Sequence, residues 1–343
     1  MTLQSRRWML MSEFRICIVA AGARGRAHAR AWSQIPDAQL VAVADVEEER
    51  AHALANEYGM RAYADFREML EREDCNVVSV CTPASLHCAP TVLAAQKGCH
   101  VLCEKPIALT IEDGEAMIEA TRKANVKLGF FFQRRFGYAS QKLDKLLAEN
   151  AVGRPVLWRI FSEAEIRPKL AMHDKHGNNG PIGDYCPHLF DRWRWLLKTE
   201  ALRVAARGFV YARGKPEVAS IRELAIDTAA IIIEFASGDI GAIVITWGLP
   251  RGLGWRNSEA ILGPNGIIDV DGEAKLTISR PEGQETFTVE DKLDMDLALV
   301  QDFIDAIRTN RTPKATGEDA LAALKMSLAT LQAIETGNWV SLA

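Results

Sequence analysis

The first 135 residues alternate short apolar runs with segments whose hydrophobic positions recur at the period of a helix. The apolar runs predict strands at residues 14–20, 40–45, 77–81, 100–103 and 127–131. The helical segments lie at 26–34, 47–57, 66–71, 89–97 and 111–124. Thr110, followed by Asp113, is a typical helix start. Because strands that alternate with helices indicate parallel βαβ units, we predict an α/β domain over residues 13–135.

The second part of the chain has a different pattern, with many short apolar runs and few helical segments. Strands are predicted at 156–161, 205–211, 228–235, 240–246, 258–262, 266–270, 275–279 and 285–289. Turn sequences separate neighbouring strands at Ser237-Gly238-Asp239, Pro264-Asn265-Gly266 and Asp271-Gly272. Two helices, near 293–309 and 317–335, end the chain. We therefore predict an α+β domain over 136–343 with a large, open, mostly antiparallel sheet, whose last helices are able to pack back on the first domain.

Composition narrows the class of protein. A chain of 343 residues with 48% hydrophobic and 25% charged residues is typical of about two globular domains. The 45 acidic and 41 basic residues nearly cancel, which argues against a nucleic-acid binder with a broad basic surface. No apolar run approaches the roughly 18–20 residues that a membrane span needs. The seven cysteines are an odd number without a CxxC pair, so we expect free thiols and a cytoplasmic protein.

The N-terminus carries a pair of arginines that superficially suggests a secretion signal. The apolar stretch after Arg6-Arg7 is too short for the hydrophobic region of such a signal. We therefore interpret residues 1–12 as a flexible lead-in, with Met11 as an alternative start.

The first candidate site is the turn after the first predicted strand. Gly22 and Gly25 occupy the second and third glycine positions of the dinucleotide fingerprint, where backbone approaches a pyrophosphate and a helix packs close to a strand. Ala20 replaces the first glycine and is compatible with the turn if its φ is negative. The N-terminus of the following helix supplies N–H donors to an anion. The residues expected to bind the dinucleotide here are Ala20, Gly22, Ala23, Arg24 and Gly25.

Asp45 ends the second predicted strand, 20 residues after Gly25. A carboxylate at this position accepts hydrogen bonds from the adenosine ribose hydroxyls and repels a 2′-phosphate, which favours NAD over NADP. Arg24 is the one residue that argues for NADP. The alternative is a tight turn without a ligand, with Asp45 as a helix cap.

Two further strand ends fall on the carboxyl edge of the predicted parallel sheet, where open α/β sheets bind ligands. One is Thr82-Pro83, with His87 beyond it, and the other is Glu104-Lys105-Pro106. A lysine held before a proline can donate a hydrogen bond to a substrate oxygen. The alternative is a solvated lysine paired with Glu104.

Taken together, these motifs resemble the Gfo/Idh/MocA oxidoreductase family, the relatives of glucose–fructose oxidoreductase and inositol 2-dehydrogenase. The resemblance rests on the Ala-x-Gly-x-x-Gly turn with His28 shortly after it, Asp45, Thr82-Pro83 with His87, and residues 98–106, and it extends from about residue 14 to the C-terminus. It implies an N-terminal Rossmann NAD-binding domain and a lysine, Lys105, that contacts substrate and nicotinamide and precedes an often cis proline. It also implies a dimer or tetramer formed through the open sheet. Further cofactor contacts are expected from Thr82, Pro83, His87 and Glu104.

A second signature lies in an amphipathic segment that continues to about Leu197. Asp184 and His188 are four residues apart and share a helix face. A histidine can take the hydroxyl proton as hydride leaves, and the aspartate can orient the substrate. This is similar to the family's Asp-x-x-x-His signature, although Pro187 and the residues 178–181 depart from its usual small residues. The alternative makes Asp184 an N-cap and His188 a core residue.

Several other residues have two interpretations. Arg135 either contacts substrate or forms a salt bridge between domains. His173 and His176 lie in a polar loop that can cover substrate, and we expect no metal there because other ligands are lacking. Trp158, Trp247 and Trp255 lie on or beside strands, where core or dimer-interface positions are expected for most of them.

The sequence thus predicts an NAD-dependent oxidoreductase that transfers hydride between a secondary hydroxyl of a sugar, sugar derivative or cyclitol and the nicotinamide. Lys105, Asp184 and His188 are the predicted catalytic residues. One alternative is an enzyme that uses NAD transiently to assist glycoside cleavage or an elimination reaction, with no net oxidation or reduction. Another is a non-catalytic NAD or sugar sensor. The expected partners are a small polyol and further copies of the chain, without nucleic acid or membrane. The substrate and the physiological direction stay open.

Overall fold

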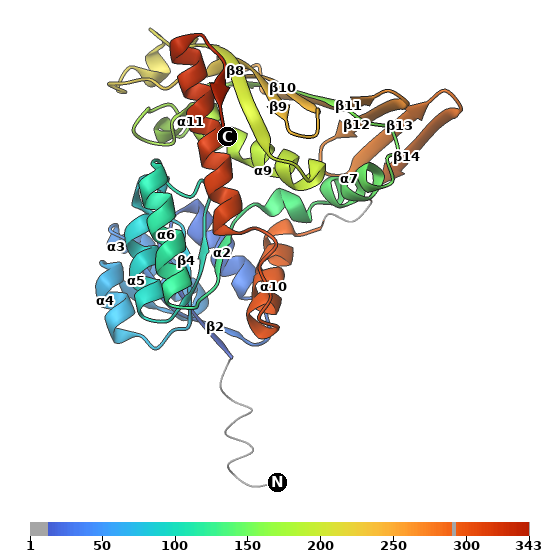
Figure 1. The fold of residues 1–343 in the computed structure, drawn as a ribbon. Coiled ribbons are helices and arrows are strands. Elements are labelled where there is room, and N and C mark those ends of the chain that lie inside the picture. Colours follow the sequence, from blue (N-terminus) through green and yellow to red (C-terminus); the bar gives the residue numbers. More distant parts are fainter. Residues whose placement is uncertain (1–12, 290–292, 343) are drawn as a thin grey trace. The chain divides into compact units, whose positions relative to one another are not determined.

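The computed structural model describes residues 13–289 and 293–342, which form two compact units (Figure 1). Unit 1 contains the described residues up to Phe131 together with Asp296–Glu318. Unit 2 contains Phe132–Met295, apart from the undescribed residues 290–292, and the chain from Asp319 on. Residues 1–12, predicted as a lead-in with Met11 as an alternative start, lie outside the described residues.

Unit 1 is built on a six-stranded sheet in which all neighbouring strands are parallel. Its strands are β1 (Phe14–Val19), β2 (Ala38–Ala44), β3 (Arg61–Tyr63), β4 (Val77–Val80), β5 (His100–Cys103) and β6 (Leu128–Phe130). The order β3-β2-β1-β4-β5-β6 is that of a dinucleotide-binding Rossmann sheet, with its switch point between β1 and β4. The predicted parallel domain is therefore confirmed. The three-residue β3 was not predicted, because a strand so short shows no hydrophobic alternation.

The helices of unit 1 follow the predicted segments closely. They are α2 (Ala23–Trp32), α3 (Glu48–Tyr58), α4 (Phe66–Arg72), the 3₁₀ turn η1 (Ala84–Leu86), α5 (Cys88–Gln96), α6 (Ile111–Lys123) and α10 (Met295–Arg308, from Asp296 on). The predicted start of α6 is confirmed, because the Thr110 hydroxyl accepts a hydrogen bond from the Asp113 N–H at 3.2 Å.

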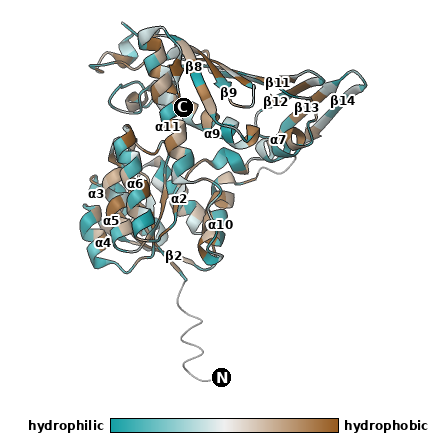
Figure 2. Cartoon of the chain, viewed as in Figure 1, coloured by the Kyte–Doolittle hydropathy of each residue, from teal (hydrophilic) through white to brown (hydrophobic). Residues whose placement is uncertain are grey.

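The core of unit 1 lies along the sheet, where Ile16, Ile18, Val43 and Val101 are completely buried. Full burial of such a side chain stabilises the fold by about 1.5–3 kcal/mol. Figure 2 shows hydrophobic residues on the strands and hydrophilic ones on the outer helix surfaces.

A late segment of the chain completes this core. The Phe130 N–H donates a hydrogen bond to the carbonyl of Ala315 at 3.1 Å, and Gly129 forms a bridge with Thr316. Gly129 also leaves room for Phe303 of α10, because a Cβ at this glycine would lie 2.7 Å from the Phe303 ring. Residues 296–318 are therefore part of the first unit, although they follow most of the second in sequence.

Unit 2 is built on a nine-stranded sheet in the order β14-β13-β12-β11-β7-β10-β9-β8-β15. The strands are β7 (Leu157–Glu165), β8 (Ala201–Phe209), β9 (Thr228–Phe235), β10 (Ile240–Leu249), β11 (Trp255–Gly263), β12 (Gly266–Asp271), β13 (Lys275–Arg280), β14 (Gly283–Thr288) and β15 (Val340–Ser341). Strands β7 and β10 pair in parallel, and the other neighbouring strands of this sheet are antiparallel. The predicted open, mostly antiparallel sheet is confirmed.

Helices cover one face of this sheet. The helical elements are η2 (Gln133–Phe136), α7 (Tyr138–Ala148), η3 (Leu170–Met172), α8 (Gly180–Asp184), α9 (Cys186–Leu197), η4 (Pro216–Val218) and α11 (Gly317–Thr336). Trp193 of α9 packs directly on Gly241, and Ile334 of α11 packs on Gly208. Helix α7 was not among the predicted elements, although its buried residues have a helical spacing. Trp158 and Trp247 are buried as expected, whereas Trp255 is 41% exposed.

The other face of the sheet carries outward hydrophobic side chains on three adjacent strands. The strand register aligns Phe161 with Val244 and Leu157 with Ile240, and Ile232 of β9 pairs with Ala242. These five large side chains, Leu157, Phe161, Ile232, Ile240 and Val244, are 37–46% exposed. We call them the outer patch.

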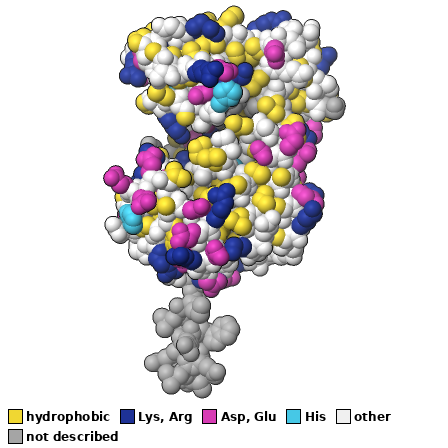
Figure 3. All heavy atoms as spheres, turned by 90° about the vertical axis from the view of Figure 1, so that its left-hand side faces the viewer, with side chains coloured by type: hydrophobic (Ala, Val, Ile, Leu, Met, Phe, Trp, Pro, Cys, Tyr) yellow, Lys and Arg dark blue, Asp and Glu magenta, His cyan; other side chains and the backbone are white. Residues whose placement is uncertain are grey.

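The chain's general chemistry agrees with its composition. All seven cysteines are free thiols, as predicted. Among the described residues, no helix has both the length and the apolar character that crossing a bilayer requires. Figure 3 shows acidic and basic side chains interspersed over the visible face, and no broad area of one sign is seen in that view.

Candidate functional site

The glycine turn joins β1 to α2 in unit 1. Ala20 has a φ of +78°, in the left-handed region, so the expectation of a negative φ at this residue is wrong. The turn reverses so tightly that a Cβ at Gly25 would lie 2.0 Å from the Ala20 carbonyl oxygen. Gly25 therefore has the predicted packing role, and Ala20 adopts a conformation that a glycine would take without strain.

The turn fits a dinucleotide on three observations. A Cβ at Gly22 would meet nothing within 4 Å, so the backbone there is open to close approach. Helix α2 begins at Ala23, and its first N–H groups have no partner within the helix. Among the described residues, the buried Arg24 Nη2 and Thr82 Oγ1 have no hydrogen-bond partner. Thr82 directly follows Cys81 at the end of β4, next to β1 at the switch point, so donors converge where a pyrophosphate binds in this fold.

Asp45 lies directly after β2 and is buried. Its Oδ2 accepts a hydrogen bond from the Ala21 N–H at 2.7 Å, and its Oδ1 accepts one from the Glu47 N–H at 2.9 Å. Helix α3 has Glu47 as its N-cap, so the alternative in which Asp45 caps that helix is not what the structure shows. The carboxylate instead holds the glycine turn against the end of β2.

Glu104 is the centre of a buried polar network. Its Oε1 accepts hydrogen bonds from Arg24 Nε at 2.5 Å and His28 Nε2 at 3.2 Å, and its Oε2 accepts one from the Lys105 N–H at 3.2 Å. Arg24 also lies 3.4 Å from Asp296 and stacks over the Phe131 ring. Glu104 therefore binds α2 as well as the backbone of Lys105.

The network continues inward through His28, which is completely buried and stacked on Phe131 with ring centroids 4.0 Å apart. Trp32 Nε1 donates to Ser79 Oγ at 2.7 Å, so the Ser79 hydroxyl hydrogen is left for His28 Nδ1 at 3.1 Å. Because a carboxylate only accepts, Nε2 of His28 carries the ring proton. His28 is therefore a neutral imidazole that accepts a hydrogen bond from Ser79 and donates one to Glu104.

Protonation of this pair follows from its surroundings. Burial alone would raise the pKa of Glu104, but the hydrogen bond from His28 and the positive charges of Arg24 and Lys105 outweigh it and hold that pKa well below its usual range. Burial lowers the pKa of His28, and the hydrogen bond and charge of Glu104 only partly oppose this. Glu104 is consequently a fixed anion beside a neutral histidine.

Lys105 follows β5 by two residues, is partly buried, and precedes a cis peptide bond to Pro106, as the resemblance implied. His87 holds this segment from behind: its Nδ1 lies 2.9 Å from the Pro106 carbonyl and its Nε2 2.9 Å from the Thr82 carbonyl. The His87 side chain is completely buried, so it has a supporting position instead of the predicted cofactor contact. It joins the strand ends that carry Thr82 and Lys105.

In unit 2, Asp184 ends α8 and His188 lies in the first turn of α9, with Tyr185 between the two helices. Both side chains are 8% exposed. Asp184 Oδ1 accepts a hydrogen bond from Asn178 Nδ2 at 3.1 Å, and the His188 ring meets Phe132 edge-on at 5.9 Å. The N-cap of α9 is Tyr185, which corrects the alternative in which Asp184 is that cap.

Tyr185 forms an aromatic cluster with Trp247 and Trp255, two tryptophans that were predicted to lie on or beside strands, whereas Tyr185 itself was not predicted to belong to a site. Its ring lies 5.5 Å from Trp255 and 6.3 Å from Trp247. Arg134 stacks over the Tyr185 ring and donates to its hydroxyl at 3.1 Å. Arg167 lies 4.7 Å from the Trp255 ring centroid and 5.8 Å from that of Trp247. We call Arg134, Arg167, Tyr185, Trp247 and Trp255 the aromatic cluster.

Arg135 is 3% exposed and binds carboxylates of its own unit. Its guanidinium binds both carboxylate oxygens of Asp191, with Nε 2.9 Å from Oδ2, and lies 3.2 Å from Asp319. These contacts stabilise unit 2, and the substrate contact and the salt bridge between domains stay predictions.

The two loop histidines have opposite environments. His173 is 1% exposed, and its Nε2 accepts a hydrogen bond from the Arg167 N–H at 2.9 Å, so it shapes the loop and does not reach a substrate. The His176 side chain is 71% exposed and lies 3.4 Å from Glu223. In the described part of the chain no three His, Cys, Asp or Glu side chains are grouped as metal ligands.

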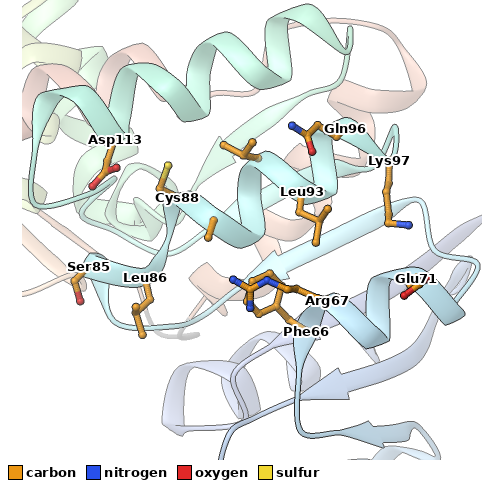
Figure 4. A pocket seen from close by; sticks show the side chains of 12 residues that line it. Phe66, Arg67, Glu71, Ser85, Leu86, Cys88, Leu93, Gln96, Lys97 and Asp113 are labelled. Carbon is orange, nitrogen blue, oxygen red and sulfur yellow. The ribbon is translucent and has the colours of Figure 1, made fainter.

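A hollow of about 710 Å³ lies elsewhere in unit 1, between α4 and α5 (Figure 4). Phe66, Arg67, Leu93, Lys97 and Asp113 are among the residues that line it. No predicted site residue lines it, and we assign no ligand to it.

Comparison with known proteins agrees with this geometry. Residues 14–132 match a family model described as "Oxidoreductase family, NAD-binding Rossmann fold". Residues 140–269 match the GFO/IDH/MocA C-terminal domain.

Relatives match along almost the whole chain. The chain is 30% identical over 336 residues to myo-inositol 2-dehydrogenase of Thermotoga maritima, covering 96% of this chain and 98% of the relative. It is 27% identical over 338 residues to scyllo-inositol 2-dehydrogenase (NAD(+)) of Bacillus subtilis, covering 96% of each. The structure is similar to scyllo-inositol dehydrogenase of Lactobacillus casei with bound NAD(H) and scyllo-inositol, with a TM-score of 0.79, 25% identity and coverage of 96% and 98%. Both parts of the chain therefore belong to the Gfo/Idh/MocA family of oxidoreductases, and unit 1 is that family's NAD-binding Rossmann domain.

Proposed function

We propose that this oxidoreductase removes hydride from a secondary hydroxyl carbon of a sugar, sugar derivative or cyclitol, or performs the reverse reduction. The observation that supports this most directly is the position of Glu104. Its carboxylate contacts the helix of the glycine turn, through Arg24 and His28, and the backbone of Lys105. The lysine is thereby fixed relative to the dinucleotide turn within one rigid network, as a hydride-transfer site requires.

Each residue has a defined task in this proposal. When bound, NAD supplies the hydride acceptor. Lys105 donates a hydrogen bond to the substrate oxygen, His188 takes the hydroxyl proton, and Asp184 accepts hydrogen bonds from neighbouring hydroxyls. Asn178 supports the last role, because its amide already orients one carboxylate oxygen of Asp184.

NAD is the proposed cofactor in preference to NADP. Asp45 presents a carboxylate after β2, where a 2′-phosphate would be repelled. Arg24, the one residue that argued for NADP, is engaged by Glu104 and Asp296 instead.

The test compares Lys105→Ala and His188→Ala with the wild-type enzyme on a panel of sugars, inositols, sugar acids and glycosides. We expect each variant to lose turnover by at least about 100-fold while its NAD dissociation constant changes little. Lys97→Ala at the C-cap of α5 and His52→Ala at an exposed position of α3 are matched controls that should keep full turnover. Wild-type turnover in both site variants would refute the assignment.

The same assay separates the two alternative functions. Product formation without accumulation of NADH would indicate transient oxidation coupled to elimination or glycoside cleavage. Tight NAD binding with no turnover of any compound would indicate a sensor.

We also propose that the chain self-associates through the outer patch of unit 2, in a reducing cytoplasm. Five large hydrophobic side chains are aligned there on adjacent strands, at 37–46% exposure. A contiguous apolar face of this kind is typical of a protein interface.

A further inference from the structure

The aromatic cluster of unit 2 contains a guanidinium, that of Arg167, which has no carboxylate partner among the described residues. Arg167 forms no ion pair with any carboxylate, and its side chain no hydrogen bond, among the described residues. Its Nε is buried without a partner. Two fully buried arginines of unit 2 have carboxylate partners: Arg135 binds Asp191, and Arg192 binds Glu259 through Nη1 at 2.7 Å. The Nη2 atom of Arg192 is buried without a hydrogen-bond partner, as Nε of Arg167 is. Arg167, which is partly buried, differs from both because no carboxylate of the described residues binds it.

Nearby carboxylates are already engaged elsewhere. Glu165, two residues before Arg167, accepts hydrogen bonds from the N–H groups of Gly252 and Gly254 at 2.5 and 3.2 Å. Asp227 accepts from the N–H groups of Tyr211 and Ala212, both at 2.8 Å. Neither forms an ion pair with Arg167, so no carboxylate in the described part of the chain is in place for it.

The guanidinium is nevertheless held firmly. It lies over the indole rings of Trp255 and Trp247, and the Trp255 ring is fixed by hydrogen bonds from its Nε1 to Ser162 and Asn257 at 3.0 and 2.9 Å. The backbone N–H of Arg167 donates to the buried His173. Such a cation–π shelf orients a guanidinium while leaving its terminal N–H groups available to a ligand.

A second unmatched donor belongs to the same cluster. Trp247 is 2% exposed, and its buried Nε1–H has no acceptor among the described residues. Two buried N–H donors without partners in one cluster, Arg167 Nε and Trp247 Nε1, are suited to a ligand group that accepts hydrogen bonds.

The cluster adjoins the Asp184 and His188 segment. Tyr185, which separates those two helices, contacts both tryptophans that carry Arg167. The loop that begins at Arg167 also supplies Asn178, which donates to Asp184. The loop and the aromatic cluster thus connect Arg167 with the segment that carries Asp184.

We propose that Arg167 recognises an anionic group, a carboxylate or a phosphate, on the substrate, so that the substrate is an acidic sugar or cyclitol derivative and not a neutral polyol. This rests on the proposed function, since it refines the substrate of that same site. A charge-assisted contact of this kind changes affinity by roughly 10- to 100-fold.

The test uses chemically matched pairs in the presence of NAD: glucose with glucuronate, galactose with galacturonate, and glucose with glucose 6-phosphate. Binding is measured by calorimetry and turnover by NADH absorbance. We expect the wild-type enzyme to bind an anionic member at least about 10-fold more tightly than its neutral partner. Whether the acids or the phosphate gain more identifies the anion.

Three variants keep the result specific. Arg167→Gln should abolish the preference, mainly through KM, and Arg167→Lys should retain part of it. Arg203→Gln is the matched control, because Arg203 also stacks over an indole, that of Trp339, but lies on β8. Equal binding of neutral and anionic members, or a preference that survives Arg167→Gln, would overturn the proposal.

The two proposals fail in different ways. An Arg167-dependent anion preference in binding, with no NADH formed from any compound, would refute the proposed oxidation and leave the anion site. NADH formed from neutral polyols without any anion preference would refute the anion site and leave the oxidation.

Discussion

The Asp45 carboxylate accepts a hydrogen bond from the Ala21 N–H at 2.7 Å, so the end of β2 and the glycine turn are held by one side chain. Asp45 thus combines support of the turn with the predicted contact to the adenosine ribose. One carboxylate can fill both roles at once. It has about four acceptor positions, and the Ala21 and Glu47 N–H groups occupy one on each oxygen.

Asp45→Ala should raise the NAD dissociation constant by roughly 10- to 100-fold and reduce the preference over NADP, because charged hydrogen bonds and repulsion of the 2′-phosphate are both lost. Fluorescence titration with each cofactor measures this. Asp65→Ala is the control: Asp65 caps α4 by accepting from the Arg67 N–H, so its loss costs stability alone, about 1 kcal/mol. An unchanged ratio of NAD to NADP affinity would contradict the assignment of Asp45.

Ala20→Gly should stabilise the protein by about 1 kcal/mol, because glycine adopts the φ of +78° without the steric strain that alanine experiences. Urea unfolding of unit 1 measures the change. Ala21→Gly, one residue later, should have the opposite sign, because Ala21 is buried and its φ is not positive. A loss of stability in Ala20→Gly would show that the methyl group makes a compensating contact.

Glu104→Gln should lower kcat at least roughly 10-fold, because the Lys105 segment loses the anion that fixes it. The unfolding free energy should fall by about 2–3 kcal/mol, since Arg24 is left partly buried without its partner. Glu73→Gln is a matched control in the same unit: that carboxylate binds Arg61 and Tyr63 and should reduce stability with kcat intact. Equal kcat in the two variants would remove Glu104 from the positioning network.

Acid should weaken the fold through His28. Burial lowers its pKa from the ordinary value of about 6.5, so below that pH the unfolded chain binds a proton that the folded chain does not. The unfolding free energy should therefore fall as pH drops from 7.5 to 5.5, by up to about 1.4 kcal/mol per pH unit for this group. The buried His87 and His173 are shifted in the same direction and add to the slope.

Urea unfolding at pH 5.5, 6.5 and 7.5 measures this slope. His28→Gln should flatten it in part, and His52→Gln, at an exposed position of α3, should leave it unchanged. A slope that does not change in His28→Gln would mean that this histidine is not buried in its neutral form.

Replacement of Val244 by glutamate should dissociate an assembly formed through the outer patch, because the register aligns Val244 with Phe161 at the centre of that face. Sedimentation velocity should then show a smaller species with unchanged helix content. Leu86→Glu is the control, since Leu86 is an exposed hydrophobic residue of unit 1. An unchanged sedimentation coefficient in Val244→Glu would exclude this face as the interface.

Local pattern was enough to predict most of the fold. Strand β5 has the predicted limits, 100–103, because a buried parallel strand is a continuous apolar run bounded by polar residues. The start of α6 at Thr110 and the helix ending at Leu197 were likewise encoded by nearby residues. The positive φ of Ala20 was not, because residue type alone favours the opposite sign.

Residues whose role depends on distant partners escaped the sequence analysis. Arg135 meets Asp191, 56 residues away, and His28 meets Glu104, 76 residues away, and no local pattern specifies either pair. Arg167 was invisible for the same reason, since its significance lies in the lack of a partner. The position of His28 could have indicated its role. It lies three residues after Gly25 among the buried residues of α2, and a polar side chain on a buried helix face needs a hydrogen-bond partner.

The pairing of Phe130 with Ala315 also determines the order in which this chain can mature on the ribosome. Synthesis proceeds from the N-terminus, so β6 emerges long before the residues that cover it. The core of the dinucleotide-binding unit therefore stays incomplete, with Gly129 uncovered, until nearly the whole of the other unit has been synthesised. A nascent chain released before Phe303 would have its first unit unfinished, whatever the state of the second.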